Sequence, residues 1–153
     1  MGRMVHLAPL LILAVLPGPE PGPPPSAAAA VVAYREAVMK SLSGHMKALG
    51  LIAAGQVGYA AHATLHASAI AEIARVLPEL FPAGSGPDRV KTDALPAVWT
   101  DAAGFAAAAA RLQSESGRLD AAARAGAPGS LRQPAANVGK ACTACHEGYR
   151  VAR

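Results

Sequence analysis

The sequence predicts an all-α protein that folds as an antiparallel four-helix bundle. Four segments beyond residue 28 repeat apolar side chains every three or four residues, which is the period of an amphipathic helix. No segment alternates apolar and polar residues as a half-buried strand does. Short breaks containing Gly and Pro separate the segments, and helices joined by short connections pack antiparallel to their neighbours.

The first two predicted helices span residues 28–49 and 59–77. Gly50 closes the first, whose inward seam consists of apolar residues and one arginine: Val32, Arg35, Met39, Leu42, Met46 and Leu49. The second ends before Pro78, and its stripe contains two histidines: His62, His66, Ile70, Ile73 and Leu77. Each stripe predicts the face that a helix turns towards its partners.

The third predicted helix begins at an N-cap, Thr92 or Asp93, and extends to Arg124. Pro96 is tolerated in its first turn. The residues expected to face inward are Val98, Ala102, Phe105, Ala109, Leu112 and Leu119. The fourth helix has Pro134 in its first turn, because a deeper position would break a hydrogen bond. Its stripe is Val138, Cys142, Cys145, Tyr149 and Ala152.

Residues 1–28 are predicted to be an export signal with a Pro- and Ala-rich junction, cleaved within residues 26–30. Arg3 supplies a positive charge, and residues 7–16 form an apolar run too short to span a bilayer. The mature domain, residues 29–153, would have no membrane anchor. Arg3 and Glu20 cancel, so the mature chain keeps the formal net charge of +4. This small excess of positive charge, without a run of basic residues, gives no support for nucleic-acid binding.

A Cys-x-x-Cys-His box, Cys142-Thr143-Ala144-Cys145-His146, lies near the C-terminus. Two thiols one helical turn apart can add to the two vinyl groups of a haem, and the next imidazole then ligates the iron. These are the only two cysteines, so a zinc site would need scattered histidines. The box predicts a bundle with one covalently bound haem c; a redox-active dithiol or a disulfide is the alternative. Haem of this type is attached outside the cytoplasm, in agreement with an export signal.

Three further side chains are predicted to lie at the haem. Arg150 follows His146 by four residues, so the two share a helix face; the alternative is a solvated Arg at a helix C-terminus. Arg35 interrupts an apolar seam, where a cation needs an anion such as a haem propionate; the alternative is a surface Arg whose stem lies over the seam. Met39 could ligate the iron or pack over an open sixth position.

The other histidines carry weaker signals. His62 and His66 stand at i and i+4 and could bind a metal or, singly, ligate the haem iron. A position at the polar end of a helix, near solvent or the haem edge, explains them adequately and is the favoured interpretation. His45 has no partner in the sequence and is predicted to lie at the surface.

Five segments carry a family resemblance: Tyr34-Arg35-x-x-x-Met39, Met46-Lys47-Ala48-Leu49-Gly50, Leu77-Pro78-x-x-Phe81-Pro82, Val98-Trp99-x-x-x-x-x-Phe105, and Gly139-Lys140-Ala141-Cys142-Thr143-Ala144-Cys145-His146-Glu147-Gly148-Tyr149-Arg150. With these the chain from about Ala30 onward resembles the cytochrome c prime family, the class II c-type cytochromes, which are four-helix bundles. The resemblance implies that Cys142 and Cys145 hold the haem, that His146 is the proximal ligand and that Arg150 is the proximal-side Arg. It also implies a haem edge formed by three residues: Arg35, Glu36 and Asp93. Glu36 replaces the Gln often seen in the family.

Met39 decides between two implied functions. Members of the family carry a bulky apolar residue over a vacant iron site, whereas closely similar low-spin relatives use a Met there as sixth ligand. The pair Tyr34 and Arg35 more closely resembles the family members whose iron is five-coordinate. We therefore expect a periplasmic haem protein that transfers single electrons and binds small gases such as NO or CO; the alternative is a low-spin electron carrier with Met and His ligands.

A haem enzyme that acts on NO or peroxide is a further alternative. Peroxide cleavage normally needs a distal acid–base pair, and Arg35 is the only polar residue placed for it. The sequence does not identify a redox partner. It does predict a homodimer, from the resemblance and from apolar residues beyond the inward seam of the first helix: Val31, Val38, Leu51 and Ile52.

Overall fold

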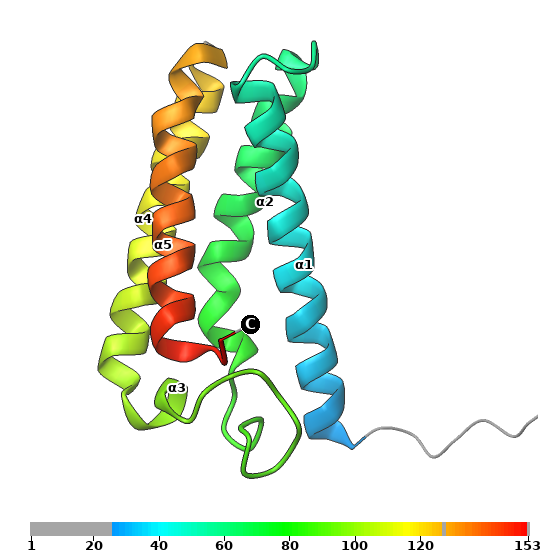
Figure 1. The fold of residues 1–153 in the computed structure, drawn as a ribbon, viewed down its shortest axis with the longest axis vertical. Helices are drawn as coiled ribbons and strands as arrows, with labels where there is room; N and C mark the ends of the chain where they lie inside the picture. Colours follow the sequence, from blue (N-terminus) through cyan, green and yellow to red (C-terminus); the bar gives the residue numbers. More distant parts are fainter. Residues whose placement is uncertain (1–25, 127, 153) are drawn as a thin grey trace, which may run out of the picture.

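The computed structural model describes residues 26–126 and 128–152, which form a bundle of four long helices (Figure 1). The long helices run up and down in alternation: α1 (Ala27–Ala53), α2 (Ala63–Val76), α4 (Ala102–Arg124) and α5 (Arg132–Tyr149). The connections contain the short helix α3 (Ala97–Thr100) and three 3-10 helices, η1 (Ala60–His62), η2 (Leu77–Leu80) and η3 (Pro128–Leu131). The predicted antiparallel four-helix bundle is confirmed.

Residues 1–25 of the predicted signal peptide lie outside the residues that the structure describes. The described chain begins at Ser26, whose hydroxyl accepts a hydrogen bond from the Ala29 amide (3.2 Å) and caps α1. Cleavage within residues 26–30 stays a prediction, and it would fall at the cap and first turn of α1. None of the helices in the described ranges is both long and apolar enough to cross a membrane.

The end of the first helix differs from the prediction. α1 continues through Gly50 and ends at Ala53, and the chain turns at Gly55, which has a φ of 70°. A side chain at that left-handed position would be strained, so Gly55 is the residue that allows the turn. The second helix is also shorter than predicted, because 3-10 turns occupy both of its ends.

The predicted third helix is in fact two helices, separated by Asp101. Asp101 has a non-helical backbone, and its side chain accepts a hydrogen bond from the Gly104 amide (3.1 Å), which caps α4. Thr92 and Asp93 therefore cap no helix. The hydroxyl of Thr92 accepts instead from the amide of Ala94 (3.2 Å), within the loop that precedes α3.

The core confirms most of the predicted inward faces. The largest fully buried apolar side chains come from several elements of the bundle: Leu49, Ile70, Leu119, Leu131 and Val138. Ala67 and Ala74 of α2 are also fully buried, and these small side chains allow close approach of the neighbouring helices. Three predicted positions are wrong: His62 and Ala102 are exposed, and Ala152 lies beyond the end of α5.

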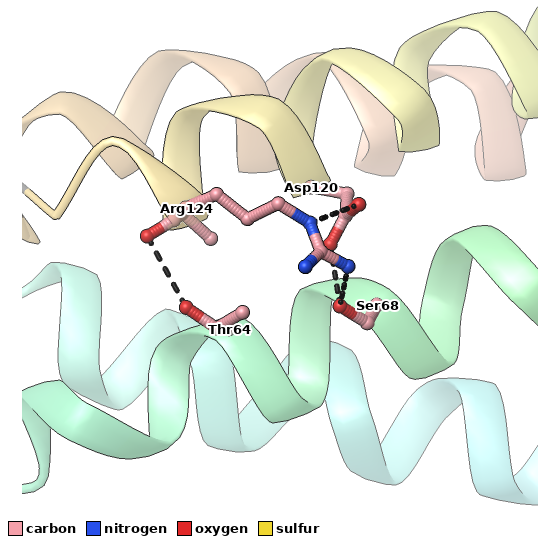
Figure 2. A network of polar contacts seen from close by, with 5 residues as sticks. Thr64, Ser68, Asp120 and Arg124 are labelled. Atoms are coloured by element: carbon pink, nitrogen blue, oxygen red, sulfur yellow. Dashed lines mark hydrogen bonds and ion pairs between the residues drawn. The ribbon is translucent and has the colours of Figure 1, made fainter.

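Polar contacts join α2 to α4 (Figure 2). Ser68 donates to Oδ1 of Asp120 (2.5 Å), Arg124 donates to Oδ2 of the same carboxylate (2.9 Å), and Thr64 donates to the carbonyl of Ala123 (3.2 Å). Burial alone would raise the pKa of Asp120, but the hydrogen bonds from Ser68 and Arg124 lower it. The network therefore fixes the register of α2 against α4.

His45 is half-buried rather than at the surface, which corrects the prediction. Its Nδ1 lies 3.0 Å from the Nδ1 of His66, across the contact between α1 and α2. Burial lowers the pKa of His66, and the nearby His45 and His62 lower it further. Folding therefore favours the neutral form of His66.

Acidification is expected to destabilise the bundle through His66. Below its ordinary pKa of about 6.5 the unfolded chain binds a proton that the folded chain resists, so the unfolding free energy falls as the pH decreases through this range. Urea denaturation of the wild type and of a His66→Gln variant, at about pH 7.5 and about pH 5.5, measures the effect. The wild type should lose more stability than the variant, and equal losses would contradict the expectation.

Candidate haem site

A cavity of about 610 Å³ lies between α1 and α5, which are packed together less extensively than the other neighbouring pairs of long helices. Its volume is in the range of cofactor and ligand sites, about 300–1,000 Å³. Its apolar walls come from all four long helices and η2: Leu42, Met46, Ile70, Leu77, Phe105, Leu112 and Val138. The cavity can therefore take a large apolar group.

The Cys-x-x-Cys-His box of α5 lines this cavity. Cys142, Cys145 and His146 all contribute to its surface, and both cysteines are half-buried free thiols. Burial raises the pKa of both thiols, and for Cys145 the nearby Cys142 raises it further. A redox-active dithiol needs a lowered thiol pKa, so this environment does not fit the dithiol alternative.

His146 is the only histidine among the residues that line the cavity. Burial lowers its pKa, and the positive charge of Arg150 lowers it further. The neutral imidazole that this environment favours is the form that ligates a metal. His62 and His66 do not line the cavity, so the structure gives no support to their role as iron ligands.

Arg150 also lines the cavity. α5 ends at Tyr149, and Arg150 is its C-cap, with an extended backbone of φ −132° and ψ 144°. Its amide donates to the carbonyl of His146 (3.2 Å), and its backbone forms an antiparallel bridge with Ala94. Its Nε is buried and has no hydrogen-bond partner in the protein. A buried N–H without an acceptor is costly, so this group suits a ligand that carries acceptor atoms.

Arg35 is buried, with 4% of its surface exposed, so the surface alternative is wrong. Its guanidinium donates to the carbonyl of Leu80 (3.1 Å), the hydroxyl and carbonyl of Ser85 (3.1 and 3.3 Å) and the hydroxyl of Thr92 (2.8 Å). It also lies 4.6 Å from the ring centre of Phe81. All of these partners are neutral, so the hydrogen bonds leave the positive charge of Arg35 at the cavity available to an anion.

The structure brings all the predicted site residues to one cavity: Arg35, Glu36, Met39, Asp93, Cys142, Cys145, His146 and Arg150. Met39 is half-buried and also packs against the hydrophobic core. Sequence reasoning missed two partners of Arg35, the backbone carbonyl of Leu80 in η2 and the loop residue Ser85, because contacts between distant segments leave no periodic signal. Tyr149, predicted on the same stripe as the two cysteines, also lines the cavity.

A haem fits this set of residues better than a bare metal ion does. The described part of the chain contains no group of three or more His, Cys, Asp or Glu side chains that could hold a metal ion. A haem brings its own equatorial nitrogen ligands and needs from the protein only an axial ligand and, in the c type, two thiols. Cys142, Cys145 and His146 meet that need.

The Cytochrome C' family model matches residues 30–150. The chain belongs to the cytochrome c prime family. The cytochrome c prime of Pararhodospirillum photometricum is 39% identical over 121 residues, which cover 79% of this chain and 96% of the relative. The solved cytochrome c prime from Rhodobacter Spheriodes has a TM-score of 0.75 at 31% identity and covers 84% of this chain and 100% of that one.

A nitric oxide complex is among the similar structures. It is a mutant of cytochrome c prime from Alcaligenes xylosoxidans, with a TM-score of 0.74 at 29% identity, and it covers 84% of this chain and 98% of that one. Cytochromes c prime bind a covalent haem c, so the cofactor of this chain is a covalent haem c, and its two cysteines fit such a site. The predicted family and cofactor are confirmed.

Proposed function

We propose that this cytochrome c prime attaches one haem through Cys142 and Cys145, uses His146 as the proximal iron ligand, binds small neutral gases such as NO and CO, and transfers single electrons. The observation that carries the proposal is that the Cys-x-x-Cys-His box lines a largely apolar cavity. The bound haem supplies an iron that changes oxidation state and can accept an axial ligand. The nitric oxide complex of the Alcaligenes xylosoxidans relative supports gas binding.

The α1 side of the cavity favours gas binding over enzymatic turnover. Met39, Leu42 and Met46 line this side with apolar side chains, beside the polar Lys40 and Ser43, and the apolar part admits a small neutral molecule. The N–H groups of Arg35 are already engaged in hydrogen bonds, so a reacting peroxide would have to displace existing partners. Glu36 lines the cavity but is exposed to solvent. We therefore infer an iron that is five-coordinate at rest, with Met39 packed over its distal side.

Charged residues at the cavity have separate proposed roles. Arg150 lies on the His146 side, where a positive charge favours the reduced, less positive iron. Arg35 and Asp93 lie at the haem edge, where the positive charge of Arg35 attracts a propionate while its hydrogen bonds to the protein remain in place. Glu36 would repel a haem propionate, because each of two neighbouring carboxylates disfavours the charged form of the other. It therefore contributes less to haem binding than Arg35 does.

Replacing His146 with Ala tests the proximal assignment. We expect the absorption spectrum of the haem protein to change in both oxidation states, because the strong protein ligand of the iron is lost. A His66→Ala variant is the matched control, since His66 does not line the cavity and its loss should leave the spectrum unchanged. A wild-type spectrum from the His146→Ala protein would rule out this ligand.

We infer a periplasmic location from the N-terminal export signal and from the attachment of c-type haem outside the cytoplasm. We further infer a homodimer. On α1, Val31 and Val38 are half-buried and Leu51 is 38% exposed, so these side chains can bury more surface against a second copy. Ile52 is only 4% exposed and belongs to the core, which corrects its predicted place in the interface.

The oligomeric state is open to direct measurement. Sedimentation velocity of the haem-loaded protein at micromolar concentration should give the mass of a dimer. A Leu51→Glu variant should sediment more slowly, because a charge at the interface opposes association. A monomer in the wild type would refute the dimer.

A further inference from the structure

One carboxylate connects the start of α4 to the end of α5. Oδ1 of Asp101 accepts from the Gly104 amide (3.1 Å), and Oδ2 accepts from the hydroxyl of Tyr149 (2.9 Å). A Cβ at Gly104 would overlap both Oδ2 of Asp101 and the Tyr149 hydroxyl, so only glycine leaves room for this contact. The hydrogen bond raises the pKa of Tyr149, so the phenol remains a donor throughout the neutral range.

Backbone pairing holds the same end of α5 against the loop before α3. The Leu95 amide donates to the Tyr149 carbonyl (3.0 Å), and the Val151 amide donates to the Asp93 carbonyl (2.8 Å). Arg150 lies between these two hydrogen bonds, in the bridge with Ala94. The chain is thus fixed on both sides of Arg150.

The ring of Tyr149 transmits this restraint to the cavity wall. It meets Phe105 of α4 edge to face, with ring centres 5.4 Å apart. Both aromatic residues line the haem cavity next to Arg150, whose Nε is buried without a protein partner. Because Nε of Arg150 has no protein acceptor to hold it, the position of this half-buried side chain depends on the restraint of the backbone that carries it.

We propose that Asp101 and Tyr149 form a clamp that positions Arg150 at the haem. The clamp consists of the Asp101 carboxylate, the Tyr149 hydroxyl and the space left by Gly104, and it acts on Arg150 through the backbone of Tyr149. Asp101 and Tyr149 are positioning residues, and the proposal rests on the proposed role of Arg150 on the proximal side. Without the clamp the cationic group moves away from its place at the cavity, and the reduced state of the iron loses part of its stabilisation.

The test is a double-mutant cycle with the reduction equilibrium of the haem-loaded protein as readout, measured by spectroelectrochemistry. Tyr149→Phe removes only the hydroxyl and keeps the packing against Phe105. We expect it to lower the equilibrium constant for reduction by about two-fold or more, the low end of the coupling measured between contacting residues. In an Arg150→Gln background the same change should have less than half of that effect, because the charge that the clamp positions is gone.

Two further variants complete the test. Asp101→Ser keeps an N-cap for α4 but removes the partner of Tyr149, so it should reproduce the effect of Tyr149→Phe even if the latter folds poorly. Tyr59→Phe removes a hydroxyl at the connection between α1 and α2, at the other end of the bundle in Figure 1, and should shift nothing. Covalent haem content and thermal unfolding are measured on every variant.

Each outcome has one meaning. A shift that depends on Arg150 supports the clamp. Two outcomes overturn the clamp alone. In one, Tyr149→Phe shifts the reduction potential equally with and without Arg150. In the other, Arg150→Gln changes the potential but Tyr149→Phe and Asp101→Ser do not. An unchanged potential in Arg150→Gln overturns the proposed role of Arg150 together with the clamp.

Discussion

A protein in which Cys142 and Cys145 are both replaced by serine is expected to contain no covalent haem and to lose much of its stability. Serine hydroxyls do not form thioethers with haem vinyl groups, so the covalent link is removed completely. Leaving even about a fifth of the 610 Å³ cavity unfilled would cost about 3 kcal/mol, at about 24 cal/mol per Å³. That is a large part of the 5–15 kcal/mol by which domains of this kind are stable.

Mass spectrometry of the denatured protein makes the measurement. The wild type should carry the added mass of one haem, the Cys142→Ser and Cys145→Ser single variants should each retain haem through one thioether, and the double variant should carry none. Thermal unfolding followed by circular dichroism then reports the loss of stability. A wild-type protein with free thiols or a disulfide, or a haem that extracts fully into acidified solvent, would disprove the attachment.

The helices and the centre of the site could be predicted because their signals are local. The spacing of residues such as Leu49 and Ile70 follows from the helical period, and both are fully buried as the pattern requires. The spacing of Cys142, Cys145 and His146 is set by one turn of a helix and by the shape of a haem. Neither inference needs knowledge of residues distant in the sequence.

The parts that sequence reasoning missed depend on distant contacts. The backbone of Arg150 is held at the cavity by a bridge to Ala94 in a distant loop, which its spacing from His146 does not reveal. Arg35 is buried because a loop about 50 residues later supplies Ser85 as an acceptor. His45 is half-buried because it meets His66 on another helix. Periodicity within one segment carries no information on such pairs.

The wrong helix boundaries have the same kind of cause. Gly50 was expected to end the first helix, but a glycine inside a helix costs only about 1 kcal/mol, which tertiary packing easily offsets. Leu49 and Ile52 on either side are buried, so the helix continues past Gly50 to Ala53, and the backbone turns at Gly55. Asp is a preferred N-cap, but the break at Asp101 was missed because the inward spacing of Val98, Ala102 and Phe105 runs across it. Its side-chain bond to the Gly104 amide identifies it as a cap.

Met39→Ala is expected to have the largest effect on function, because this residue decides whether the iron is open to gases. Met39 lines the cavity from α1 and packs against the hydrophobic core. If it packs without ligating, a gas molecule enters by displacing the thioether side chain. Where that displacement adds about 1.4 kcal/mol to the barrier, truncation to Ala speeds carbon monoxide binding about ten-fold. The resting spin state should stay nearly the same.

Flash photolysis of the ferrous carbonyl complex and absorption spectra of both oxidation states measure the two effects separately. Met46→Ala is the matched control, because Met46 lines the same cavity two helical turns further along α1 and its loss enlarges the cavity by a similar amount. If Met39 is instead the sixth ligand, the resting protein is low-spin with a methionine-to-iron charge-transfer band, and Met39→Ala converts it to high-spin. That result would overturn the five-coordinate proposal and leave an electron carrier, because a gas would then have to break a bond to the iron rather than move a side chain that only packs over it.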